Sequence, residues 1–120
     1  MKSFNIAIIG CGTVGGGVAK IIKEINGNLE KRAGREIKVS KIVELNPPVA
    51  MERFDLPADV FCGGGVEIAK EDTTKYIEEI LADDSIDLVV ETIGGTNDFV
   101  HKLCVDICKS KKHVVSANKA

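Results

Sequence analysis

The sequence predicts an α/β fold in which helices cover both faces of a doubly wound parallel sheet. Three observations predict it. Short apolar runs typical of buried strands alternate with apolar residues at helical spacing, and the first run, Phe4 to Ile9, stops at a glycine cluster in residues 10–17. The near-continuous apolar run 86–90 is expected of a parallel strand covered on both sides. With 120 residues and 44% hydrophobic content, we expect one domain, residues 1–120.

The glycine cluster is typical of the turn with which a dinucleotide-binding unit begins. Gly10 would allow the tight turn, Gly12 would let the backbone approach a pyrophosphate, and Gly15 would let the next helix pack closely. The phosphates would then meet the unpaired amides at the start of that helix. The helix itself is predicted by apolar residues at helical spacing: Val14, Val18, Ile21, Ile22 and Ile25. A purely structural glycine turn is the alternative.

The middle of the chain is less regular. Residues 37–45 predict a second strand that ends near Glu44. Residues 47–59 contain three prolines and little periodicity, so we expect a loop there. Residues 60–62 are a candidate for a short third strand, which the glycines at 63–65 would close with a turn.

In the last third of the chain, helix and strand patterns again alternate clearly. We expect a helix that Asp72 or Thr73 caps and that ends at residues 83–85. The apolar positions of this helix are Tyr76, Ile77, Ile80 and Leu81. The apolar strand 86–90 follows. Thr96 or Asn97 would then cap a helix, and a final strand begins at Val114; the apolar residues of that helix are Phe99, Leu103 and Ile107.

Ligands of such sheets collect at the carboxyl ends of the strands, where the strand order reverses. We therefore expect the glycine turn, residues 92–95 and residues 116–119 to lie close together.

Composition narrows the classes of partner. Sixteen basic and eighteen acidic residues give a formal charge of −2, which offers no electrostatic argument for nucleic acid or an anionic membrane as partner. No apolar stretch approaches the ~20 residues of a membrane span, and residues 1–10 lack the apolar core and cleavage site of a signal peptide. These features favour small-molecule ligands and a cytoplasmic location. The basic run at 109–112 is expected to be a solvated helix end.

The four cysteines, Cys11, Cys62, Cys104 and Cys108, have neither CxxC pairing nor the spacing of a disulfide framework, so we expect reduced thiols. The alternative for two of them is a metal site with His101, which shares their helical spacing. Packing of these cysteines against the sheet is the preferred interpretation, and no metal is expected.

Three phrases resemble one family when taken in order: Gly-Cys-Gly-Thr-Val-Gly at 10–15, Val-Glu-Thr-Ile-Gly-Gly at 90–95, and His-Val-Val-Ser-Ala-Asn-Lys-Ala at 113–120. Together they are similar to the amino-terminal NAD(P)-binding domain of homoserine dehydrogenase, a Rossmann-like fold. The resemblance implies hydride transfer that interconverts homoserine and aspartate 4-semialdehyde, in the biosynthesis of threonine, methionine and isoleucine. It also implies a second domain that binds substrate, donates the main proton and forms a homodimer or higher oligomer, so this chain alone would be inactive.

The resemblance assigns roles to individual residues. Thr92, Ile93 and Gly94 would contact the ribose on the nicotinamide side, while Ser116 and Asn118 would shape the next loop. The pyrophosphate would lie on Gly10, Gly12, Thr13, Val14 and Gly15. Lys119 is the candidate catalytic residue, because a cation beside the nicotinamide could stabilise negative charge on the aldehyde oxygen. A lysine that holds a cofactor phosphate is the alternative.

Cofactor choice depends on the end of the second strand. A carboxylate there accepts hydrogen bonds from the adenosine ribose and repels a 2′-phosphate, so Glu44 favours NAD over NADP. Many family members carry an arginine and an aspartate in this stretch, and this chain departs from that pattern. Arg35 or Arg53 could still reach the site, and Glu44 as an exposed strand-end residue without a ligand stays open.

Two other functions fit the same glycine turn. One is a non-catalytic nucleotide-sensing module, for which nothing would require Asn118 and Lys119 beside the nicotinamide. The other is the cofactor domain of a different two-domain dehydrogenase, since no residue here specifies the substrate.

Overall fold

The computed structural model describes residues 3–34, 36–93 and 98–116. Within these residues, four parallel strands form one sheet in the order β2-β1-β3-β4. The strands are β1 (Phe4–Ile9), β2 (Ile37–Val43), β3 (Leu88–Glu91) and β4 (His113–Ser116). The chain passes from β1 to β2 on one side and then returns to β3 on the other, so the strand order reverses between β1 and β3.

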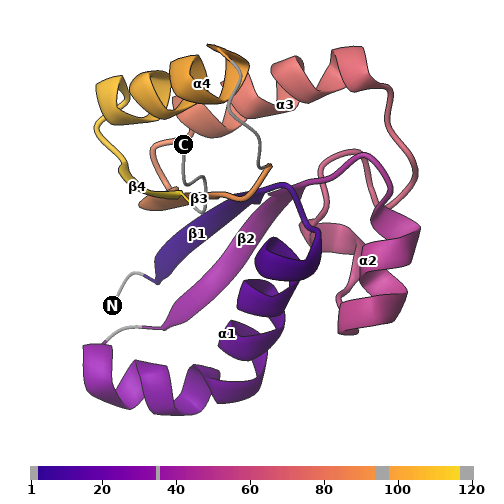
Figure 1. Ribbon diagram of the computed structural model, residues 1–120. Coiled ribbons are helices and arrows are strands. Elements are labelled where there is room, and N and C mark those ends of the chain that lie inside the picture. Colours follow the sequence, from indigo (N-terminus) through magenta and orange to yellow (C-terminus); the bar gives the residue numbers. More distant parts are fainter. Residues whose placement is uncertain (1–2, 35, 94–97, 117–120) are drawn as a thin grey trace.

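Helices cover both faces of this sheet (Figure 1). They are α1 (Thr13–Ala33), α2 (Pro47–Phe54), α3 (Lys70–Ala82) and α4 (Asp98–Lys109), with a short 3₁₀ helix η1 (Ala58–Val60). In Figure 1, α1 and α2 lie on one side of the strands, whereas α3 and α4 lie on the other. The predicted doubly wound α/β fold is therefore confirmed.

The two faces have separate hydrophobic cores because successive side chains of a strand point to opposite sides. Ile6 and Ile8 of β1 pack with residues of α1 and α2, including Ala19 and Phe54. Ala7 and Ile9 face the other core, which contains four side chains from α3 and α4: Ile77, Ile80, Leu103 and Ile107. An apolar run such as β1 is thus required by burial on both sides.

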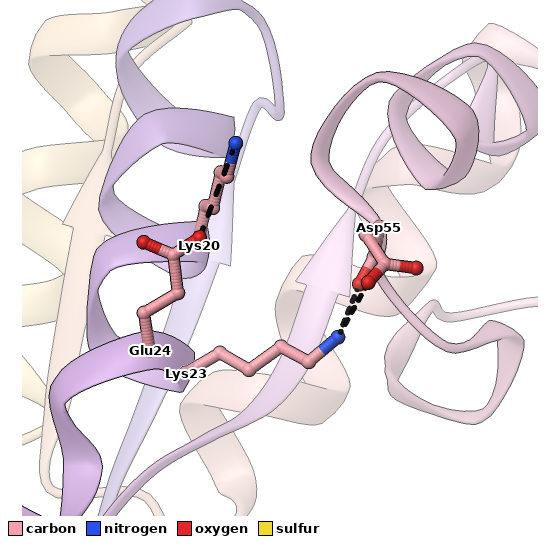
Figure 2. A network of polar contacts seen from close by, with 4 residues as sticks. All are labelled: Lys20, Lys23, Glu24 and Asp55. Carbon is pink, nitrogen blue, oxygen red and sulfur yellow. Dashed lines mark hydrogen bonds and ion pairs between the residues drawn. The ribbon is translucent and has the colours of Figure 1, made fainter.

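The contacts between α1 and α2 include a close packing contact and an ion pair. A Cβ at Gly16 would lie 2.0 Å from the Phe54 ring, so the missing side chain makes room for the aromatic ring. The Lys23 ammonium donates to the carbonyl of Asp55 at 2.5 Å and lies 3.4 Å from its carboxylate, as Figure 2 shows beside the Lys20–Glu24 pair. Asp55, with φ 53°, is the C-cap of α2, so Lys23 binds the end of that helix.

The expected loop over residues 47–59 is wrong. Pro47 and Pro48 occupy the first turn of α2, where a proline loses no intrahelical hydrogen bond and its fixed φ suits the helix. The expected third strand at 60–62 is wrong as well. Phe61 forms only an isolated parallel bridge with Ile42, after η1 has turned the chain.

Two details of the helices also differ from expectation. α3 begins at Lys70 rather than after Asp72 or Thr73; its N-cap is Ala69 with no side-chain cap bond, and it ends at 82 as expected. The apolar stripe of α1 is narrower than predicted, since Val14 and Ile21 are 55% and 57% exposed. The predicted caps Thr96 and Asn97 lie outside the described residues. Among the described helices, none combines the length and apolar character that a membrane crossing would need.

Candidate functional site

A cavity of about 630 Å³ lies at the carboxyl ends of β1, β2 and β3, beside the start of α3. Its lining comprises Ile9, Gly10, Gly12, Val43, Glu44, Leu45, Lys70, Thr73, Thr74, Ile77, Thr92 and Ile93. We refer to it as the crevice. It occupies the point where the strand order reverses, which is where open parallel sheets bind their ligands. Two of the three segments expected to meet, the glycine turn and residues 92–93, line it together.

The glycine turn has three different environments. Gly10 has φ +91°, and a Cβ there would lie 3.2 Å from the backbone of Thr92 and Ile93. A Cβ at Gly15 would lie 2.1 Å from the Gly10 carbonyl oxygen, so the helix packs on its strand as predicted. A Cβ at Gly12 would meet nothing within 4 Å. Gly12 therefore leaves open space beside the first amides of α1, where a phosphate could be bound.

Hydrogen bonds of Thr92 connect the end of β3 to this turn. Its hydroxyl donates to the Gly10 carbonyl, and its N–H donates to the carbonyl of Ile9 at 3.0 Å. The next residue, Ile93, is 43% exposed and lines the crevice. An apolar residue at this position offers van der Waals contact to a ligand ring rather than a side-chain hydrogen bond.

Glu44 also holds the glycine turn. Its Oε1 accepts from the N–H of Cys11 at 2.9 Å, and its Oε2 accepts from the N–H of Asn46 at 2.9 Å. A carboxylate has about four acceptor positions, so two remain for hydroxyl groups of a ligand. Burial, and secondarily the Glu44 charge, raises the pKa of the Cys11 thiol to about 11, which keeps this thiol protonated and neutral near pH 7.

Arg53 reaches the same turn from α2. Its Nη2 donates to the Thr13 hydroxyl at 3.2 Å, and its guanidinium lies 4.9 Å from the centre of the Phe54 ring. The Thr13 side chain is thus brought into the site with a cation, whereas the sequence indicated mainly its backbone amide. Val14 follows it in the first turn of α1 and is exposed. Arg35, the other basic candidate, lies outside the described residues.

Glu91, which the sequence reasoning did not single out, lies at the carboxyl end of β3 and is fully buried. Its Oε1 accepts from the N–H of Ile93 at 2.6 Å, and its Oε2 accepts from the Ser116 hydroxyl at 2.6 Å. Ser116 is thereby connected to the crevice through Glu91. Three further candidates, Gly94, Asn118 and Lys119, lie outside the described residues.

The alternative metal site on α4 gains no support. Among residues 3–34, 36–93 and 98–116, no three His, Cys, Asp or Glu side chains lie close enough to hold an ion. Burial raises the pKa of the Cys104 thiol, as does the charge of Glu91, and only the thiolate is a good metal ligand. All four cysteines are free thiols.

Comparison with known proteins gives a consistent answer. The family model described as homoserine dehydrogenase, NAD binding domain, matches residues 10–120. Homoserine dehydrogenase of Bacillus subtilis is 34% identical over 119 residues, which cover 99% of this chain and 24% of that protein. The enzyme of Methylobacillus glycogenes is also 34% identical, over 100% of this chain and 26% of that protein.

Solved structures agree. Homoserine dehydrogenase from Thiobacillus denitrificans superposes with a TM-score of 0.73 at 32% identity, covering 99% of this chain and 24% of that one. The enzyme from S. aureus at pH 6.5 gives 0.70 at 33% identity, covering 99% and 27%. The chain thus spans about a quarter of the length of these relatives.

Proposed function

The chain belongs to the family of homoserine dehydrogenase NAD-binding domains, and on this premise we propose that it binds the cofactor of an enzyme that interconverts homoserine and aspartate 4-semialdehyde. The observation that carries the proposal is the crevice at the reversal of the strand order, bordered by a glycine turn with open space at Gly12. Chemistry of this kind needs a dinucleotide held with its nicotinamide toward the substrate.

The cofactor would lie along the ends of three strands. Its pyrophosphate would accept from the first amides of α1, at Gly12, Thr13 and Val14, where the helix dipole also favours an anion. Its adenosine ribose would donate to Glu44. Its nicotinamide ribose would lie against the segment that Thr92 and Ile93 begin.

NAD is the preferred cofactor and NADP the alternative. Glu44 opposes a 2′-phosphate, and its two bonds to backbone amides hold it at the end of β2. Arg53 at Thr13 is a cation beside the glycine turn that could favour a phosphate instead, and Lys70 is a cation in the lining of the crevice. We prefer NAD because Glu44 lines the crevice.

Substrate binding would require a further domain, since the relatives are about four times as long as this chain. Lys119 would then stabilise charge on the reacting carbonyl, with Asn118 and Gly94 as further contacts. The whole enzyme would be a homodimer or larger, without nucleic acid or membrane as partner. The four free thiols of this chain favour a cytoplasmic location.

Calorimetric titration of this chain with NAD tests the proposal. We expect binding, and we expect Gly12→Ala to weaken it by about tenfold or more, because the added methyl group occupies the space of the phosphate while meeting no protein atom. Gly17→Ala is the matched control, since a Cβ there also meets nothing within 4 Å but lies outside the turn.

The melting temperatures of both variants should match or exceed that of the parent chain. Failure of the parent chain to bind NAD, or equal binding by Gly12→Ala, would refute the proposed site. Oxidation of homoserine by this chain alone would show that no further domain is needed.

A further inference from the structure

Glu91 is a charged residue in a place where an apolar one would be expected. It is 0% exposed, and it follows Val89 and Val90 on a strand covered by both cores. Burial of a carboxylate is strongly unfavourable before its contacts are counted, and an apolar replacement of similar volume is often neutral or stabilising. The contacts of Glu91 must therefore explain its presence.

One contact of Glu91 leads to the edge of the crevice, and the other leads to the end of β4. One oxygen accepts from Ile93, which lines the crevice, and the other accepts from Ser116 at the end of β4. The register pairs Glu91 with Ser116, so a single side chain connects Ile93, just after β3, with the last residue of β4. Both donors point at a short distance, 2.6 Å, toward an acceptor-only group.

We propose that Glu91 is a positioning residue that holds residues 92–93 beside the end of β4 and so orients the nicotinamide half of the cofactor. The inference rests on the proposed function. Glu91 has no exposed surface and would not touch the cofactor itself. The adenosine half depends on other contacts, those of Glu44 and the glycine turn, so loss of Glu91 should affect the two halves unequally.

The test compares the affinity of this chain for NAD with its affinity for ADP, which lacks the nicotinamide half. Glu91→Met keeps an unbranched side chain but removes both strong acceptors. We expect it to weaken NAD binding by about tenfold, while ADP binding changes by less than about twofold. Hydrogen exchange at the Ile93 amide should become faster in the same variant, because its acceptor is gone.

Glu91→Gln is the rescue variant. Its carbonyl can accept from Ile93 while its amide donates to the Ser116 hydroxyl, which accepts as well as donates. We expect affinity for NAD and exchange at Ile93 close to those of the parent chain. Asp87→Ala is the matched control, since the Asp87 carboxylate accepts from the backbone N–H of Asn5 at the opposite end of β3. It should lower the melting temperature without changing the ratio of NAD to ADP affinity.

The outcomes separate the two proposals. If the parent chain binds neither NAD nor ADP, the proposed function fails and the role of Glu91 fails with it. If the parent chain binds NAD and Glu91→Met keeps the ratio of the two affinities, the inference about Glu91 alone is overturned. An equal loss of NAD and ADP affinity in Glu91→Met also overturns it, because that result indicates a general role in the fold.

Discussion

Glu44 is ordered before any ligand arrives, because two backbone amides hold its carboxylate at the end of β2. A fixed acceptor loses little conformational freedom when a ribose binds, which is the general advantage of preorganisation. The same fixed charge lies in the path of a 2′-phosphate. Cofactor choice can therefore be tested at this one residue.

We predict that Glu44→Gln lowers the ratio of the NADP dissociation constant to the NAD dissociation constant by about tenfold, equivalent to ~1.4 kcal/mol. Glutamine retains the size of the side chain and one acceptor oxygen, so it removes the negative charge that repels the phosphate together with one of the two bonds to backbone amides. Titration with each cofactor measures the ratio. Glu78→Ala, a change at an exposed residue of α3, should leave the ratio as it is. An unchanged ratio in Glu44→Gln would assign Glu44 to the support of the turn alone.

Residues of the site differ in how well the sequence predicts them. Gly10 and Gly15 could be predicted, because a turn and a close helix contact demand glycine at fixed spacing. Glu91 could not, since an acidic residue after an apolar run is typical of an exposed strand end. Its burial arises from packing around β3, including the pairing with Ser116, 25 residues away.

At the level of elements, the contact of α1 with α2 sets the position of Arg53. The Phe54 ring occupies the space that a side chain at Gly16 would take, and Arg53 precedes it in the same helix. The bond from Arg53 to Thr13 follows from this contact. The exposed ion pair of Lys23 with Asp55 adds little stability, as is usual for exposed pairs.

We predict that Gly16→Ala lowers the free energy of unfolding by about 1–3 kcal/mol, the range for overpacking of a close contact. Gly17→Ala, one position further, should raise it by up to ~1 kcal/mol, because alanine favours a helix and meets open space. Urea unfolding of both variants gives the two values. Equal effects in the two variants would contradict a specific contact with Phe54.

The helices and strands also differ in how well the sequence predicts them. β1 and β3 are predicted by apolar runs because local pattern and burial agree. α2 is not, since two adjacent prolines signal a break in the middle of a helix and are tolerated only at its start. The bridge of Phe61 to Ile42 depends on how η1 turns the chain, and no local periodicity encodes that.

At the scale of the whole molecule, the location of the crevice follows from connectivity. β1 is central, with β2 on one side and β3 on the other, and the helices that follow β1 and β3 lie on opposite faces of the sheet, which leaves a space at the ends of these strands (Figure 1). No single stretch of sequence contains this site. The same logic extends to the longer enzyme that we propose, in which substrate would meet the nicotinamide beyond the ends of β3 and β4.

The proposed role of Lys119 concerns the whole enzyme, because that role exists only when substrate is bound. It follows Ser116 by three residues, and in the whole enzyme it would stabilise charge on the reacting carbonyl. Only an interaction that is stronger in the transition state than in the ground state accelerates the chemical step. We therefore predict that Lys119→Ala lowers kcat by about a hundredfold, roughly 2.7 kcal/mol, with little change in the affinity for NAD.

Steady-state kinetics of the whole enzyme, with homoserine and NAD varied in turn, measures both effects of Lys119→Ala. A lysine that only holds a cofactor phosphate would give the reverse pattern, a higher KM for NAD with kcat nearly intact. Lys109→Ala, at an exposed residue in the last turn of α4, controls for the loss of one positive charge and should change neither constant. A normal kcat in Lys119→Ala would assign the stabilisation of the carbonyl charge to another residue of the whole enzyme.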